Sequence, residues 1–132
     1  MNCLLDTHTL LWALFSPELL SARSAKLIRD PENTVYVSVV SFWEISLKYA
    51  LGKLELTNVL PDNLPDVAQQ MGLELLSLDA PEAATFYRLH RVGHKDPFDR
   101  LIIWQAIQYK LTLISKDSSF EEYKGIGLKT CW

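Results

Sequence analysis

The stretch NCLLDTHTLLWALF, residues 2–15, contains the transition that decides the fold. Its first four residues form a short apolar run that suits a buried β-strand, whereas the segment from Thr7 to Phe15 favours a helix. A strand that leads directly into a helix opens a β–α unit, and such units build parallel sheets covered by helices. Asp6 stands at the junction, where it either caps the helix or lies in a site at the edge of the sheet.

The same alternation of short apolar runs and helical segments continues along the chain, which indicates an α/β fold with a central parallel sheet. TVYVSVV (34–40) is the clearest further strand, because it is rich in β-branched residues. We predict strands at residues 2–5, 34–40, 73–78, 111–115 and 127–132. We predict helices at residues 7–15, 21–30, 41–52, 65–71, 79–92, 97–109 and 118–123.

The bulk composition predicts one globular domain over residues 1–132, with 48% hydrophobic residues and no internal repeat. A net charge of −3 argues against nucleic-acid binding through a general basic field, although a bound metal and a local basic patch can still engage such a substrate. Cys3 and Cys131 are expected to be buried thiols of a reduced protein. No apolar run reaches the roughly 18 residues of a membrane span, so we expect a cytoplasmic protein that does not enter the membrane.

Acidic residues recur where strands end and helices begin. Asp6 follows the first predicted strand, and Glu44 falls in the first turn of the helix after the second. Asp99 falls in the first turn of the helix before the fourth strand, and Asp117 lies two residues past that strand. Ligands of parallel α/β sheets bind at the carboxyl ends of the strands, where helix N-termini also lie. The four carboxylates are therefore expected to share one cleft.

Each of these acids also has a purely local explanation. Asp6 can cap a helix, Ser41 and Glu44 have the spacing of a capping box, and Asp117 suits a turn. Together, however, two carboxylates about 5 Å apart repel by roughly 3 kcal/mol at an effective dielectric near 20. Such a cluster must protonate in part or hold divalent cations, and carboxylate oxygens favour Mg²⁺ or Mn²⁺ over Zn²⁺. The spacing thus indicates metal-dependent phosphoryl chemistry.

The segment HKDPFDRLI, residues 94–102, separates the two roles that an acid can have at a helix start. Pro97 suits the first helical position, because its missing N–H would have no partner there. Asp96 is then the N-cap and Asp99 the third helical residue. On this segment alone helix capping explains both acids better than metal binding does. Asp96 is expected to be mainly the cap, with an outer-shell metal role as the alternative.

Four segments resemble, in order, the motif blocks of the PIN-domain ribonucleases, and most closely those of the VapC-type toxins of bacterial toxin–antitoxin pairs. They are LLDTHTLLW (4–12), SVVSFWEISLKYALGKL (38–54), HKDPFDRLIIWQA (94–106) and TLISKD (112–117). The resemblance implies a three-layer α/β/α sandwich that hydrolyses RNA with Mg²⁺ or Mn²⁺ bound by Asp6, Glu44, Asp99 and Asp117. It also implies a homodimer, and a small antitoxin whose tail covers the cleft. Ser115 matches the hydroxyl residue that commonly stands two before the last acid.

Neighbouring polar residues have two interpretations each. Thr7 either orients substrate or metal-bound water, or merely begins its helix. Arg100 and Lys116 flank two of the acids and can contact phosphate, or they belong to a solvated charged face. The same holds for four further basic residues, Arg88, Arg91, His94 and Lys95. His8 and His90 are expected to be packing or surface residues, because no second histidine stands at metal-ligand spacing.

Two other function classes compete with the nuclease. The D-T-H-T sequence from Asp6 faintly resembles the nucleophile motif of haloacid-dehalogenase-like phosphohydrolases, in which Asp6 would form a phosphoenzyme. A PIN-like fold can also serve as a non-catalytic binding module. Trapping of phosphate on Asp6 would support the first alternative, and failure to bind Mn²⁺ would support the second.

Overall fold

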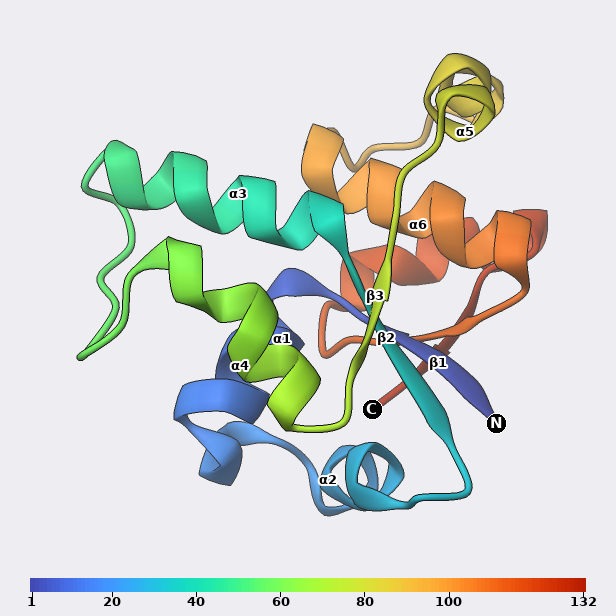
Figure 1. The fold of residues 1–132 in the computed structure, drawn as a ribbon. Helices are drawn as coiled ribbons and strands as arrows, with labels where there is room; N and C mark the ends of the chain where they lie inside the picture. The colour runs from blue at the N-terminus through green and yellow to red at the C-terminus, as the bar shows by residue number, and fades with distance from the viewer.

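The computed structural model describes residues 1–132 and has a five-stranded sheet at its centre (Figure 1). All four neighbouring pairs of strands are parallel, and the strand order is β3-β2-β1-β4-β5. The central parallel sheet predicted from the sequence is therefore confirmed. The strands are β1 (Asn2–Leu5), β2 (Thr34–Ser38), β3 (Glu74–Leu76), β4 (Thr112–Ile114) and β5 (Lys129–Cys131).

Helices cover both faces of the sheet, as the predicted sandwich requires; in Figure 1 α5 and α6 lie above it and α2 and α4 below. The α-helices are α1 (Thr7–Phe15), α2 (Ala22–Arg29), α3 (Val39–Ala50), α4 (Leu64–Gln70), α5 (Ala80–Thr85) and α6 (Pro97–Tyr109). Short 3₁₀ helices are η1 (Pro17–Leu19), η2 (Pro61–Asn63), η3 (Phe86–Arg88) and η4 (Ser118–Ile126).

The two faces of the sheet carry separate hydrophobic cores, because successive side chains of a strand point to opposite faces. From β1, Leu4 packs in the core that also holds Ile103 of α6 and Phe120 of η4. Its neighbour Leu5 packs in the other core, with Leu10 of α1. All these side chains are at most 1% exposed, so β1, which Asp6 follows directly, is packed on both faces.

The start of α3 differs from the prediction. β2 ends at Ser38, and the helix begins at Val39, two residues earlier than expected. The Ser38 hydroxyl caps the helix by accepting a hydrogen bond of 3.0 Å from the Val40 N–H. Ser41 consequently lies inside the helix, where it forms no capping box, and Glu44 falls in the second turn instead of the first. At the far end Gly52 has φ +70°, a left-handed conformation that ends the helix as predicted.

The helix predicted for residues 79–92 is shorter, since α5 ends at Thr85 and only η3 follows it. The chain then runs irregularly to Asp96. The guanidinium of Arg100 donates to the carbonyl oxygens of Leu89 at 3.2 Å and His90 at 3.4 Å. Tertiary contacts therefore help to fix the segment that carries His94.

Cys3 and Cys131 are both buried and unpaired, as predicted. None of the helices combines the length and the apolar character needed to cross a bilayer.

Candidate metal centre

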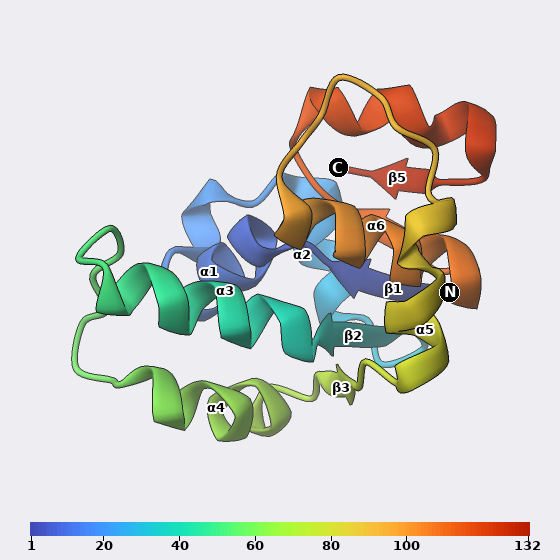
Figure 2. The ribbon, with the colours of Figure 1, turned by 90° about the horizontal axis from the view of Figure 1, so that it is seen from above.

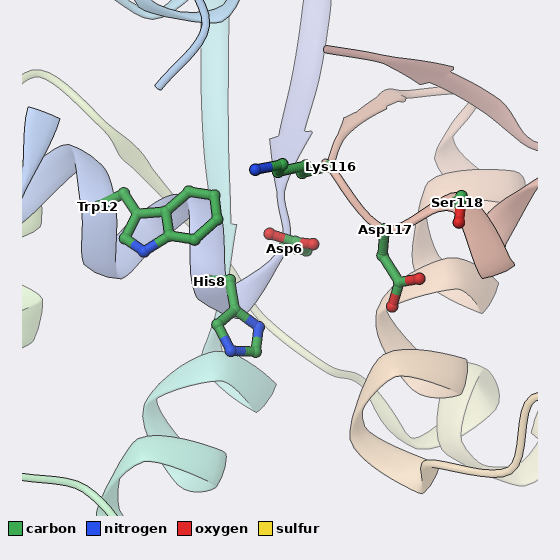
Figure 3. Close-up of a pocket in the computed structure, with 6 residues that line it drawn as sticks. All are labelled: Asp6, His8, Trp12, Lys116, Asp117 and Ser118. Atoms are coloured by element: carbon green, nitrogen blue, oxygen red, sulfur yellow. The ribbon is translucent and has the colours of Figure 1, made fainter. Parts of the chain in front are cut away.

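The strand order creates a switch point between β1 and β4. The chain runs outward from β1 to β2 and β3, and later returns to place β4 and β5 on the other side of β1 (Figure 2). Ligands of open α/β sheets bind in the crevice at such a point, outside the carboxyl ends of the strands. A pocket of about 420 Å³ lies in this place, and Figure 3 shows the residues that line it. It is lined by Asp6, His8, Trp12, Lys116, Asp117 and Ser118.

Asp6 both caps α1 and belongs to the pocket, so the two explanations of this residue hold together. One carboxylate oxygen accepts a hydrogen bond of 2.8 Å from the Thr9 N–H, and the other accepts from the Ser115 hydroxyl. Burial raises the pKa of the Asp6 carboxyl, and these hydrogen bonds oppose the rise. The Ser115 oxygen also accepts a hydrogen bond of 3.1 Å from the Asp117 N–H. Ser115 therefore links Asp6, at the end of β1, to Asp117, which follows β4.

Glu44 reaches the site from α3 and is only 2% exposed. One of its oxygens accepts a hydrogen bond of 2.6 Å from the Thr7 hydroxyl, next to Asp6 in the chain, and the other is paired with Lys48. Burial disfavours the Lys48 cation, but its bond to Glu44 and the charges of Glu44, Asp96 and Asp99 raise the pKa of Lys48 overall. Lys48 was not singled out from the sequence, although its spacing four residues after Glu44 is that of a helical ion pair.

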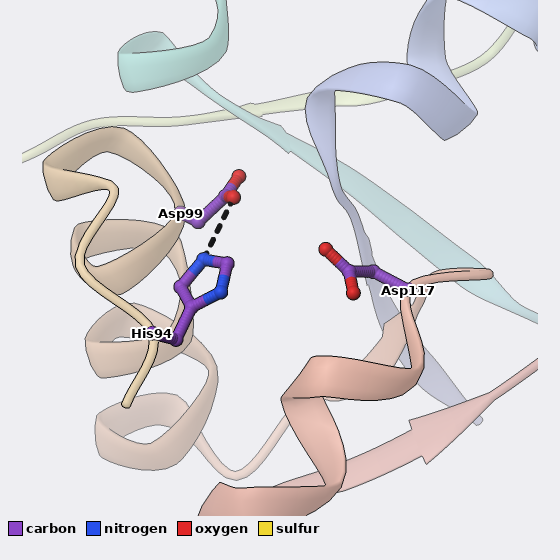
Figure 4. A group of neighbouring side chains, drawn as sticks. All are labelled: His94, Asp99 and Asp117. Carbon is purple, nitrogen blue, oxygen red and sulfur yellow. Dashed lines mark hydrogen bonds and ion pairs between the residues drawn. The ribbon is translucent and has the colours of Figure 1, made fainter. Parts of the chain in front are cut away.

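Asp99 lies in the first turn of α6 and faces His94, whose Nε2 is 2.9 Å from the carboxylate oxygen Oδ2. Burial raises the pKa of Asp99 to about 6, the charges of Asp96 and Glu44 add to the rise, and His94 opposes it. The acids of α3 and α6 are therefore close enough to repel each other. Figure 4 shows Asp117 directed toward Asp99 and His94 from the opposite side.

Asp117 is the exposed member of the group. One of its oxygens accepts hydrogen bonds from the Ser119 N–H at 2.9 Å and from the Ser119 hydroxyl at 2.6 Å. Partial burial favours the protonated form, but these two bonds prevail and lower the pKa of Asp117. One ligand atom each from His94, Asp99 and Asp117 lies within 4.8 Å of the others.

The neighbouring candidates are placed differently. Asp96 caps α6 by accepting hydrogen bonds from the N–H groups of Phe98 at 2.9 Å and Asp99 at 3.1 Å. Arg100 donates to the Tyr123 hydroxyl at 2.9 Å and braces the segment before α6, so its donors are directed away from the acids. Lys116 lines the pocket, with its ammonium 5.9 Å from the centre of the Trp12 ring.

The sequence assigns His94 to a local basic edge or a solvated face, whereas in the structure His94 contacts Asp99. His8 is exposed, as predicted for a packing or surface residue, and it lines the pocket with Asp6. A signal for His94 was present, because it stands only five residues before Asp99 and two before the N-cap Asp96. The conformation that brings it back onto Asp99 could not be inferred from that spacing.

The arrangement fits a hard divalent cation. The pKa of Asp6 and that of Asp99 are both raised, which means that the protein alone does not fully compensate their charges. A divalent cation removes that cost, and carboxylate oxygens are the ligands that Mg²⁺ and Mn²⁺ prefer. The acids are four carboxylates with the imidazoles of His8 and His94 beside them and no thiolate, which argues against a structural zinc site.

The chain belongs to the PIN domain family, whose model matches residues 3–126. It is 25% identical over 129 residues to ribonuclease VapC22 of Mycobacterium tuberculosis (strain ATCC 25618 / H37Rv), an alignment that covers 98% of this chain and 97% of that protein. Among solved structures, VapBC2 from Rickettsia felis bound to a promoter DNA fragment matches with a TM-score of 0.67 at 18% identity, covering 99% of this chain and 98% of that one. DNA-bound VapBC from Salmonella typhimurium matches with a TM-score of 0.63 at 18% identity, covering 99% and 97%. These structures share the fold.

Proposed function

We propose that this PIN-domain protein is a metal-dependent endoribonuclease and the toxin of a toxin–antitoxin module. The observation that carries the proposal is the convergence of Asp6, Glu44, Asp99 and Asp117 on the carboxyl edge of the sheet. Membership of the PIN family and the similarity to ribonuclease VapC22 support it. The structures named after VapBC support the toxin–antitoxin part.

The four acids would hold Mg²⁺ or Mn²⁺, which supplies an activated water and offsets charge on the phosphodiester oxygens. The surrounding side chains keep the carboxylates in place. Ser115 holds Asp6, while Thr7 and Lys48 occupy the two oxygens of Glu44. Since Lys48 reaches Glu44 from the same helix, it also reduces repulsion among the acids when no cation is bound.

The pocket offers contacts for an RNA strand despite the negative net charge. Lys116 provides a local cation for a phosphate, and the neighbouring Trp12 ring provides a face on which a base can stack. His8 lines the same pocket next to Asp6 (Figure 3). We assign phosphate contact to Lys116 and not to Arg100, because the Arg100 donors bind Tyr123 and loop carbonyls.

We also propose that the protein acts in the cytoplasm, where RNA is available. Its two proposed protein partners are a second copy of the chain and an antitoxin. α3 carries large apolar side chains that remain exposed, among them Trp43 at 60% and Leu47 at 40%. Apolar residues gathered on one surface helix favour a protein contact, and tryptophan is enriched at such contacts. We propose that the chain forms homodimers and is inhibited by an antitoxin that covers the acidic cleft.

The direct test is cleavage of structured RNA by the purified protein in Mg²⁺, with EDTA as the metal-free arm. We expect cleavage that EDTA stops and that Asp6→Ala and Asp99→Asn abolish. Asp66→Asn is the matched control, because Asp66 is an exposed acid in the first turn of α4. Full cleavage by either site variant would refute the mechanism. Labelling of Asp6 by a phosphate ester would instead favour the phosphohydrolase, and failure to bind Mn²⁺ would favour the binding module.

A further inference from the structure

His94 is held in one orientation beside the acids. Its side chain is 13% exposed, and its ring packs edge-on against Phe120 and Tyr123, with ring centres 5.3 and 6.5 Å apart. Nε2 lies 2.9 Å from Oδ2 of Asp99, and Nδ1 lies 3.0 Å from the Ser119 hydroxyl (Figure 4). The ring thus joins the acid of α6 to the segment that carries Asp117.

The hydrogen bonds around Ser119 determine which ring nitrogen carries the proton. The Ser119 oxygen is 2.6 Å from Oδ1 of Asp117, and an ionised carboxylate has no hydrogen to give. The only hydroxyl hydrogen of Ser119 is therefore donated to Asp117. In the contact with His94 the Ser119 oxygen must accept, so Nδ1 of His94 carries a hydrogen.

With Nδ1 protonated, Nε2 either carries a second hydrogen, which it donates to Asp99, or presents a lone pair to the carboxylate oxygen. In the second case the two acceptors, 2.9 Å apart, need a cation bound to both of them. In an octahedral site with bonds of about 2.1 Å, adjacent ligand atoms are separated by about 3 Å, which matches the observed spacing. Histidines that bind metals also donate their other ring N–H to a fixed acceptor, as Nδ1 does here.

We propose that His94 is itself a metal ligand through Nε2, beside Asp99, and that the site consequently prefers Mn²⁺ to Mg²⁺. The inference rests on the metal site of the proposed function and adds a nitrogen to its ligands. Imidazole is a better ligand for Mn²⁺ than for Mg²⁺, which binds oxygen almost exclusively. His8 is the competing imidazole, since it lines the pocket that also holds Asp6 and Asp117.

Pulsed electron paramagnetic resonance of the full chain loaded with Mn²⁺ tests the proposal, because it detects nitrogen bound directly to the ion. We expect nitrogen coupling in the wild type, its loss in His94→Asn, and its retention in His8→Asn. The asparagine amide keeps a hydrogen-bond donor for Ser119 near the position of Nδ1 but has no counterpart of Nε2. His90→Asn is the matched control, because His90 is an exposed histidine. Mn²⁺ affinity should fall at least tenfold in His94→Asn, with a smaller loss for Mg²⁺.

A measurement on the unsubstituted protein removes any dependence on how the variant folds. Histidine labelled with ¹⁵N should replace the ¹⁴N coupling by a ¹⁵N coupling. Bound Mn²⁺ without nitrogen coupling would overturn the role of His94 while the acidic site stands. Coupling lost only in His8→Asn would assign the nitrogen to His8 and also overturn it. Failure of the wild type to bind Mn²⁺ at all would overturn the proposed function together with this inference.

Discussion

Replacement of Asp99 by asparagine should stabilise the metal-free protein, because Asp99 is held close to other negative charges. Burial, Asp96 and Glu44 raise its pKa from 3.8 to about 6. The native state then binds a proton that the unfolded chain releases, so stability falls as the pH rises from about 4 to about 6 and stays reduced above that window. Two pKa units correspond to about 3 kcal/mol. Asparagine avoids this cost but loses about 0.5 kcal/mol of interaction with the α6 dipole.

The net gain is about 2 kcal/mol at pH 7.5, or a rise in Tm of about 6–8 °C for a domain of this size. Thermal unfolding followed by circular dichroism in EDTA, at pH 4 and pH 7.5, measures it. The difference between Asp99→Asn and wild type should nearly vanish at pH 4 and be absent for Asp66→Asn. Saturating Mg²⁺ should stabilise the wild type and leave Asp99→Asn almost unchanged. An Asp99→Asn protein no more stable than wild type at pH 7.5 would show that these acids do not repel one another.

Substitutions at two further positions, Ser115 and Asp96, test how the acids are held. Ser115→Ala should destabilise the protein by about 1.5–3 kcal/mol in urea unfolding and weaken Mn²⁺ binding, because buried Asp6 loses a charge-assisted hydrogen bond; unchanged stability would contradict the role given to Ser115. Asp96→Ala should cost about 1 kcal/mol through loss of the α6 cap, whereas Asp96→Asn should keep most of it. If Asp96 is only the cap, Asp96→Asn should change Mn²⁺ affinity less than tenfold in calorimetric titration, and a larger loss would establish the outer-shell role.

The sheet and the placement of Asp6 and Asp117 could be predicted because they follow from chain order. Short apolar runs next to helical segments define β–α units, and the residue after each parallel strand must lie on the carboxyl edge. The start of α3 could not be predicted from the pattern alone. Val39 and Val40 favour a strand by composition, and Ser38 and Ser41 are both suitable caps; packing of Val40 in a core favours the earlier helix start.

The position of His94 depends on contacts that no local pattern contains. The segment before α6 is irregular and is shaped by Arg100, which bonds its carbonyls, and by Tyr123, against which the His94 ring packs. Arg100 lies beyond this segment, in α6, and Tyr123 is distant in sequence, in η4. Periodicity therefore locates the helices on either side of this segment, while the imidazole that completes the cluster is placed by tertiary structure.

Diffraction from crystals grown or soaked with Mn²⁺, using the anomalous signal of the ion, tests the central claim most directly. A peak about 2.2 Å from carboxylate oxygens of Asp6, Asp99 and Asp117, with Glu44 directed at the same ion or at a water bound to it, is the expected result. Anomalous density only elsewhere on the protein, with these four carboxylates unliganded at saturating Mn²⁺, would contradict it.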